Sequence, residues 1–385
     1  MKRYLYIVII FLKSSIVFGQ NPDDISVSFD KILKHFKETI GYNFFAGQIN
    51  DTVSSSSLYR TKEFNVSISK NPVLLDTTHI VIENPYYNDK IDDYDDEFKN
   101  YPVSYSVLYE GTLVSLFRNG KFVCHNILSL KRDTEFEKKL NTKKFKHHWI
   151  INNKLGGLSR NKIYIWTNNK WKKTKIKFPL RKQPKLFEDD DFIVFNDCHG
   201  EWGGTIYFYD KVSRTIHFTE STCANSVYKR DGKYIVLAKL GHMMGTSDIK
   251  IIENPRKLTI AKKREINKIK EGGALGYSDK SKTYEELNLY GIQLFSTFKY
   301  EERQLYIVNL NELTFLAEIE GNEIQIVHPI FDNEIYTHEP VTTSYENYTL
   351  INLDHYGTAR DKEVSVIIVG EKRIIIIDWN EKHSR

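Results

Sequence analysis

The 385-residue sequence contains only three cysteines, Cys124, Cys198 and Cys223. So few cysteines exclude a small fold held together mainly by disulfides, and a chain of this length can build a core without them. The sequence also lacks a phosphate-binding glycine loop and the glycine-flanked serine of a nucleophile elbow. These absences favour binding over catalysis, and they leave an enzyme open as the alternative.

After the N-terminal apolar run, no second apolar run is long enough to cross a bilayer. The N-terminus itself has the order of a secretory signal peptide, because Lys2 and Arg3 precede the apolar core and the small residue Gly19 lies at the expected cleavage site. The core ends at Lys13 and is too short for a comfortable anchor. We therefore expect a signal peptide at residues 1–19, no transmembrane segment after its cleavage, and export to the periplasm or the extracellular space.

The sequence has little excess charge of either sign. It contains 55 Lys and Arg residues against 50 Asp and Glu residues, a formal net charge of +5. Cleavage of the signal peptide removes Lys2, Arg3 and Lys13 and lowers this charge to about +2. Net charge therefore gives no support for nucleic-acid binding, and export argues against it.

The most regular part of the sequence is residues 184–260, which contain one strand pattern twice. Short β-branched and aromatic runs alternate there with turn-forming residues. The runs of the first copy are 184–188, 191–196, 205–210 and 215–220. Those of the second copy are 226–230, 233–238, 248–252 and 257–261. Each copy predicts a four-stranded antiparallel meander.

The two copies are offset by about 42 residues, within the range of roughly 40–50 residues for one blade of WD-type and kelch-type propellers. A single sheet of this kind cannot bury both of its faces, so such repeats pack radially against their neighbours. The pattern therefore resembles a β-propeller. The resemblance stops at the architecture, because neither the Gly-His and Trp-Asp pairs nor the kelch double glycines recur. A β-sandwich or another two-sheet domain is the alternative.

Further runs with strand character continue the pattern on both sides of the double repeat. They are 64–69, 79–82, 105–109, 112–117, 121–124, 148–151, 162–166, 171–178, 292–298, 304–308, 315–319, 324–327, 348–353, 364–369 and 373–379. The sequence thus predicts an all-β propeller of about six four-stranded blades at residues 61–385. We expect the terminal strands to complete the first blade and close the ring.

Residues 20–60 are expected to form a helix and a polar linker before the propeller. Five apolar residues fall at helical spacing, and Gly41 follows them as a C-terminal cap would. These apolar residues are Phe29, Ile32, Leu33, Phe36 and Ile40. A second short helix is predicted at 133–140, and residues 262–286 are predicted to be an insertion or a long loop.

Two charged segments have a functional and a structural interpretation each. The acidic run 89–97 lacks the glycine and the closing glutamate of an EF-hand loop, so a solvated loop is favoured over a calcium site. Lys173, Lys175 and Lys177 share one face of the predicted strand 171–178. Lysines on an outermost strand discourage association between sheet edges, and a polyanion-binding patch is the alternative.

The cysteines are expected to pair as Cys198 with Cys223, leaving Cys124 as a buried thiol. Cys198 begins the connection between the second and third strands of one meander, and Cys223 lies in the link to the next meander. Successive antiparallel strands reverse direction, so these two connections emerge on the same face. Two separate buried thiols are the alternative.

The chemically richest segments are the loop 197–204 and its counterpart 240–246 in the second copy. If the repeat is real, both loops open on one face, where functional residues of a rigid sheet scaffold usually lie. Together they supply the candidate site residues His199, Glu201, Trp202, His242, Met243 and Met244.

A binding face needs the fewest assumptions. Trp202 offers a flat apolar ring with a polar nitrogen, the glycines let a partner approach the backbone, and His199 and Glu201 supply directed hydrogen bonds. The partner expected at this face is a ligand, a glycan or a protein.

Three other interpretations of the same loops stay open. His199, Glu201 and His242 form a possible zinc-ligand set for a metal-dependent enzyme. His242, Met243 and Met244, with a reduced cysteine, would suit copper. In the structural interpretation, Trp202 is a wedge packed between blades.

Overall fold

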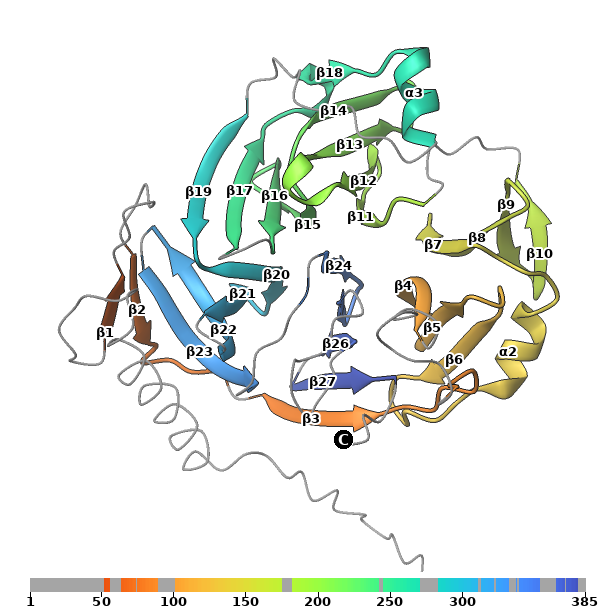
Figure 1. Ribbon diagram of the computed structural model, residues 1–385, viewed down its shortest axis with the longest axis horizontal. Coiled ribbons are helices and arrows are strands. Elements are labelled where there is room, and N and C mark those ends of the chain that lie inside the picture. Colours follow the sequence, from red (N-terminus) through yellow and green to blue (C-terminus); the bar gives the residue numbers. More distant parts are fainter. Residues whose placement is uncertain are drawn as a thin grey trace, which may run out of the picture.

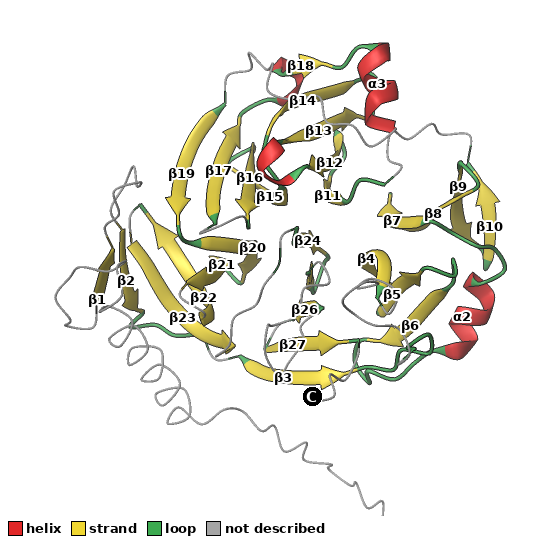
Figure 2. Cartoon of the chain, viewed as in Figure 1, coloured by secondary structure: helices red, strands yellow, loops and turns green. Residues whose placement is uncertain are grey.

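The computed structural model describes residues 52–55, 64–73, 75–88, 101–174, 182–241, 245–270, 283–310, 313–321, 323–331, 337, 339–353, 365–370 and 372–379. Over these residues the chain is almost entirely β-structure, with two α-helices and two short 3-10 helices at the periphery and in loops (Figure 2). The signal peptide at 1–19, the N-terminal helix and the acidic run 89–97 lie outside the described residues.

The strands form six sheets arranged in a ring, which is a six-bladed β-propeller (Figure 1). The predicted all-β propeller of about six blades is therefore confirmed. We number the blades from 1 to 6 along the chain, starting at the first strand that lines the central channel.

Each blade begins with an inner strand at the channel and continues outwards. Blade 1 contains β4 (Pro102–Tyr109), β5 (Thr112–Phe117) and β6 (Phe122–Asn126). Blade 2 contains β7 (His147–Ile151), β8 (Lys154–Ser159), β9 (Lys162–Thr167) and β10 (Lys170–Lys173). Blade 3 contains β11 (Lys185–Glu188), β12 (Phe192–Cys198), β13 (Gly204–Asp210), β14 (Ile216–Glu220) and β18 (Thr259–Ile260).

The other three blades have the same plan. Blade 4 contains β15 (Ala224–Arg230), β16 (Lys233–Leu240), β17 (Thr246–Ile252) and β19 (Tyr284–Tyr290). Blade 5 contains β20 (Gln293–Tyr300), β21 (Arg303–Leu310), β22 (Leu313–Glu320), β23 (Glu323–Phe331), β2 (Phe64–Ile68) and β1 (Thr52–Ser55). Blade 6 contains β24 (Val341–Ser344), β25 (Thr349–Asn352), β26 (Val366–Val369), β27 (Arg373–Asp378) and β3 (Asp76–Val81).

The strands are apolar on both faces because each blade packs against two neighbours. In β12, Phe192 and Val194 belong to the cluster shared with blade 4, whereas Ile193 and Phe195 belong to the cluster shared with blade 2. Successive side chains of a strand point to opposite sides of the sheet, so an unbroken apolar run serves two interfaces. One buried cluster lies between each pair of neighbouring blades in the described chain.

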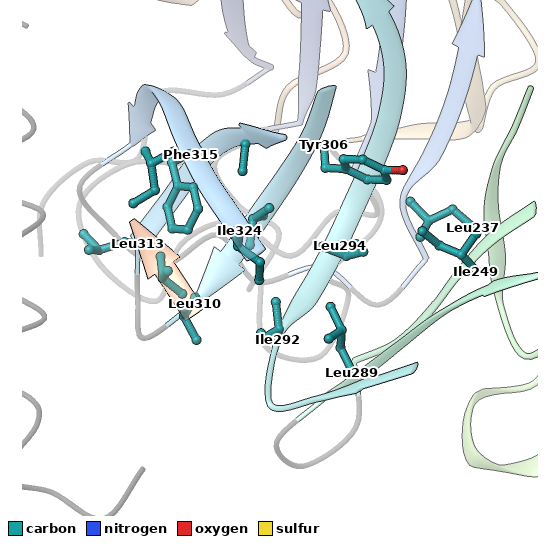
Figure 3. Packing of buried hydrophobic residues seen from close by; sticks show 14 of the residues in the cluster. Leu237, Ile249, Leu289, Ile292, Leu294, Tyr306, Leu310, Leu313, Phe315 and Ile324 are labelled. Carbon is teal, nitrogen blue, oxygen red and sulfur yellow. The ribbon is translucent and has the colours of Figure 1, made fainter. Parts of the chain in front are cut away.

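The cluster between blades 4 and 5 illustrates this packing (Figure 3). Leu237 and Ile249 from blade 4 meet Leu294 and Tyr306 from blade 5, and each of these side chains is at most 4% exposed. The propeller core is therefore distributed around the ring between the sheets and has no single centre.

Two-residue turns set the register of several hairpins. Asn168 and Asn169 join β9 to β10 with φ of 52° and 55°, and Asp231 and Gly232 join β15 to β16 with φ of 51° and 75°. Turns with two positive φ angles match the twist of the strands they connect, and Asn, Asp and Gly tolerate that conformation. Both turns lie between runs that the sequence predicts to be strands.

Blade 1 departs from the expected four strands. The helix α2 (Thr134–Leu140) follows β6 and occupies the outer position where a fourth strand would lie (Figure 1). Its first turn is capped by Asp133, whose carboxylate accepts a hydrogen bond from the backbone N–H of Phe136 at 2.9 Å. The helix expected at 133–140 is confirmed, and its role in completing a blade is new.

The structure of blade 4 shows that the prediction for the second copy of the repeat was wrong in its fourth strand. The segment expected as its fourth strand, 257–261, instead contains the end of the 3-10 helix η2 (Pro255–Lys257) and β18, which pairs with β14 of blade 3. The actual fourth strand is β19, which pairs with β17. The intervening chain includes the helix α3 (Lys263–Lys270). The prediction failed because the polar β19 lacks the apolar pattern of an inner strand.

The terminal strands close the ring, as expected. The C-terminal hairpin β26–β27 shares a sheet with the N-terminal strand β3, which pairs in parallel with β27, and by our numbering this sheet is blade 6. The strand β2 pairs in parallel with β23 of blade 5, which was not expected. The N-terminal segment therefore covers the outer edges of blades 5 and 6 before the chain enters blade 1.

Three smaller differences concern strands. The strand β8 was not expected, because Gly156 and Gly157 interrupt its apolar pattern. Thr52–Ser55, within the expected polar linker, forms β1. The strand β10 is the outermost strand of blade 2 and its Lys173 is exposed, but it ends there, and Lys175 and Lys177 lie outside the described residues.

Candidate functional site

The loop between β12 and β13 forms a compact 3-10 turn, η1 (Gly200–Trp202). The backbone N–H of His199 donates to the carbonyl of Gly203 at 2.9 Å, and the N–H of Trp202 donates to the carbonyl of His199 at 3.1 Å. Gly200 and Gly203 have φ of 58° and 90°, a region that side chains with a Cβ rarely adopt. The glycines seen in the sequence are thus required by the turn.

The base of this loop is fixed to the link that leads to blade 4. A disulfide joins Cys198 to Cys223 with a Cα–Cα distance of 4.4 Å, as predicted, and Cys124 is a free buried thiol. At Gly204, an added Cβ would lie 2.6 Å from the carbonyl oxygens of both Asp197 and Ser221. The backbone is therefore packed too closely for any side chain at position 204.

Polar contacts beneath the loop continue this support. The hydroxyl of Tyr207 donates to Oδ2 of Asp197 at 2.8 Å, and burial raises the pKa of Asp197. Gln183 also hydrogen-bonds to Asp197, and its carbonyl accepts from Nε1 of Trp149 at 2.9 Å. The loop is therefore held by blade 3 and, through Gln183, by blade 2.

The predicted site residues of this loop have different environments. Trp202 is 77% exposed, which rules out the interpretation that it is a wedge between blades. Glu201 is exposed, and His199 is half-buried. Nε2 of His199 is shielded from solvent and has no hydrogen-bond partner in the described chain. The loop therefore presents one projecting indole and one acid to solvent.

The second predicted loop cannot be placed beside the first. His242, Met243 and Met244 lie outside the described residues. The flanking Gly245 is described, and its carbonyl accepts a hydrogen bond from the N–H of Gly291 at 2.9 Å. The end of β12 and the end of β16 lie on the same face of the ring, because each is the second strand of its blade, and we call this the disulfide face.

The metal interpretations stay predictions. Over the described residues, no three His, Cys, Asp or Glu side chains lie close enough to hold a metal ion, and His242 is not among those residues. Cys198 is in a disulfide, so the copper set with a reduced cysteine would require its reduction.

A cavity of about 220 Å³, which the sequence did not predict, lies where blades 6 and 1 meet the channel on the disulfide face. The inner strand β4 shifts register against β5 twice, between Pro102 and Ser104 and between Ser104 and Val107. Such bulges re-aim side chains and are frequent beside functional sites. In this blade they place Ser104 and Ser106 in the cavity wall.

Asn352 of blade 6 holds the bulged strand in place. Its Oδ1 accepts from the N–H of Ser106 at 2.8 Å, and its Nδ2 donates to the carbonyl of the same residue at 3.0 Å. The amide thus takes the place of a strand partner for the backbone N–H and carbonyl of one residue, Ser106. A strand pattern cannot reveal such a bulge, because the residues that cause it come from both ends of the chain.

Ser104 also lies 2.6 Å, through its Oγ, from Nδ1 of His148. Nε2 of this histidine lies 2.9 Å from the carbonyl of Val114 and must carry the proton, since a carbonyl only accepts. Burial lowers the pKa of His148 to about 4, so the ring is a weak base. The pair therefore orients the Ser104 hydroxyl and offers little help to a nucleophile.

The described helices are all too short or too polar to span a bilayer. No protein-family model matches the chain, and a search of curated proteins also found no match.

Several solved structures are similar to this chain at low identity. BamB from Moraxella catarrhalis is 9% identical with a TM-score of 0.32, over 81% of this chain and 93% of that chain. The tricorn protease is 11% identical with a TM-score of 0.41, over 73% of this chain and 26% of that chain. The extracellular domain of a putative hybrid two component system from B. thetaiotaomicron is 11% identical with a TM-score of 0.33, over 78% and 40%. The propeller assignment rests on the sheet topology described above.

Proposed function

We propose that this protein is an exported binding protein that engages a protein partner through the disulfide face, with Trp202 as the anchor. The carrying observation is an indole that is 77% exposed on a loop fixed at its base by a disulfide. The four other tryptophans, Trp149, Trp166, Trp171 and Trp379, are each at most 8% exposed. An unburied tryptophan on a rigid loop supports a role outside the fold.

The geometry supports a macromolecular partner over a small ligand. Trp202 projects into solvent and does not line the channel cavity on the same face. A projecting aromatic ring binds by inserting into a pocket of its partner, and tryptophan is enriched among the residues that dominate interface energies. The disulfide limits the entropy that the loop loses on binding.

Two observations support export. The sequence begins with the pattern of a signal peptide, and the disulfide suits an oxidising compartment such as the periplasm or the extracellular space. A glycan partner is the nearest alternative at the same loop. A metal-dependent reaction has weaker support, which is the shielded and unpaired Nε2 of His199.

The experiment is photo-crosslinking with p-benzoylphenylalanine at position 202 in exporting cells. Val212 is the matched control position, because it is 79% exposed and lies in the β13–β14 turn on the opposite face. We expect a discrete crosslinked protein from position 202 and none from position 212. Trp202→Ala should then weaken the affinity for that protein by roughly 30-fold, the loss typical of a hot-spot residue.

Iodide quenching of tryptophan fluorescence gives an independent readout, since Trp202 is the exposed indole of this protein. The captured partner should protect that fluorescence from iodide. Equal crosslinking from both positions, or unchanged affinity in Trp202→Ala, contradicts the proposal. If the wild type binds to a glycan array and Trp202→Ala does not, the partner at this loop is a glycan and not a protein.

A further inference from the structure

A second hollow lies on the face opposite the disulfide face. It has a volume of about 420 Å³ and opens between blades 5 and 6, within the range of roughly 300–1,000 Å³ for ligand pockets. Three turns surround it: the β20–β21 turn, the β24–β25 turn and the β26–β27 turn. Three of its wall residues are Tyr300, Tyr345 and Tyr348, and we call it the tyrosine cleft.

The tyrosine rings are held in place from behind. All three are half-buried and pack on the clusters that join blade 6 to its two neighbours. The hydroxyl of Tyr345 accepts a hydrogen bond from the N–H of Leu108 at 3.0 Å. The ring of Tyr348 lies against Gly370, where an added Cβ would come within 3.0 Å of Cε1. The cleft therefore presents rigid aromatic surface before any ligand arrives.

The described residues that line the rim of the cleft carry both charges. Lys299 and Lys372 supply two ammonium groups, and Glu301 and Glu346 supply two carboxylates. These four side chains are exposed, and so is Asn347. Lys299 pairs with Glu302 at 3.0 Å, but the two side chains are 63% and 94% exposed, so that pair is weak and can rearrange. The described part of the rim therefore offers both hydrogen-bond donors and hydrogen-bond acceptors to a ligand.

This combination matches the chemistry of a sugar. Hydroxyl groups donate to carboxylates, accept from ammonium groups and do both with an amide, so a polyhydroxylated ligand satisfies every rim group. The C–H faces of a pyranose ring are apolar and pack on aromatic rings, which bury large areas at little entropic cost. We propose that the tyrosine cleft binds a neutral oligosaccharide, stacked on the tyrosines and hydrogen-bonded to the β24–β25 turn.

A peptide fits the cleft less well. A peptide side chain needs an apolar pocket as its anchor, but the floor residues Phe298, Thr349 and Val369 are at most 7% exposed. The apolar surface left to a ligand is that of the rings. A charged polymer would meet two like charges on the rim whatever its sign.

The test is isothermal titration calorimetry of the full-length protein with maltotriose, cellotriose and xylotriose, and with a neutral tripeptide. We expect saturable binding of at least one trisaccharide. Asn347→Ala changes an exposed turn residue and should weaken binding by about tenfold, as loss of a hydrogen-bonding group does. Gly370→Ala pushes the Tyr348 ring from behind and should also weaken it, whereas Tyr348→Phe should retain it.

Trp202→Ala serves as the control, because it lies on the opposite face and should bind the trisaccharide like the wild type. If no protein partner is found at Trp202, the oligosaccharide site is therefore still tested by this experiment. If no trisaccharide binds, the proposed partner at Trp202 is unaffected. Absence of binding by all three trisaccharides, binding of the tripeptide alone, or unchanged affinity in both Asn347→Ala and Gly370→Ala overturns the proposal. Circular dichroism spectra of the variants establish that each one is folded.

Discussion

At the scale of single residues, buried histidines are the groups most sensitive to solution conditions. His125 and His148 are each 2% exposed and His328 is 0% exposed, and burial lowers the pKa of each to about 4. For His328, ring atoms lie 3.1 Å from the carbonyl of Val73 and 3.0 Å from Oγ1 of Thr77. This histidine therefore ties blade 5 to the N-terminal segment in its neutral form.

These shifts predict acid sensitivity. The unfolded chain binds a proton at each histidine near pH 6.5, whereas the folded protein binds it only near pH 4, so protonation favours unfolding. Stability should be constant above about pH 6.5 and should fall as the pH decreases towards 4. Each histidine contributes up to about 3 kcal/mol at the acid end. Urea unfolding measured from pH 7 down to pH 4 gives the number of protons taken up.

His148→Gln should reduce that proton uptake by about one, because it removes one of the shifted groups. The free energy of unfolding of this variant at neutral pH is measured in the same series. That value gives the effect of the substitution on packing, and the change with pH gives its effect on proton uptake. A free energy of unfolding that stays constant over the whole range would show that these rings are already protonated in the folded protein or are not buried.

At the scale of elements, the disulfide and Gly204 together fix the loop that carries Trp202. The disulfide spans 25 residues and joins the β12–β13 loop to the link between blades 3 and 4. Without the bond, the compact turn at Gly200–Trp202 would keep its own hydrogen bonds but lose its attachment to the neighbouring link.

Replacing both cysteines by serine should lower the free energy of unfolding by about 3 kcal/mol, the entropic value for a loop of this length. Denaturant titration of Cys198→Ser with Cys223→Ser measures this loss. Wild-type protein treated with dithiothreitol is the matched control and should match the double variant. A reduced protein as stable as the oxidised one would mean that the crosslink constrains the unfolded chain little.

At the scale of the whole molecule, the N-terminal segment closes the ring from outside. β3 pairs along its whole length with β27, and His79 of β3 lies 2.6 Å from Oδ2 of Asp378 of β27. Val73 and Leu75 are at most 5% exposed in the cluster between blades 5 and 6. The strands β2 and β3 thus cover two sheet edges that would otherwise be open.

A variant that lacks residues 1–81 should be less stable than the whole protein, because the edge of β27 and part of a buried cluster become exposed. We expect a melting temperature lower by at least about 5 °C and a tendency to aggregate. Circular dichroism and size-exclusion chromatography measure both effects. A variant that lacks only residues 1–19 is the control, and equal melting temperatures for the two would contradict closure by β3.

The sequence predicted most of the inner strands and the cysteine pairing correctly, for a local reason. Runs such as residues 192–195 are apolar on both faces, and their repetition about 42 residues later is a property of neighbouring residues along the chain. The turns at Asn168 and Asp231 and the helix cap at Asp133 also depend only on residues that are neighbours along the chain. The pairing of Cys198 with Cys223 followed from the alternation of strand directions alone.

Only the tertiary structure decided which strand joins which sheet and where the cavities lie. The parallel pairing of β3 with β27 joins residues about 300 positions apart along the chain, and the bulged strand β4 is held at Ser106 by Asn352 from the last blade. The tyrosine cleft combines turns of two blades. Hydrophobic patterning specifies that a strand is buried on both faces, but the choice of its neighbours depends on contacts between distant segments, which no local pattern encodes.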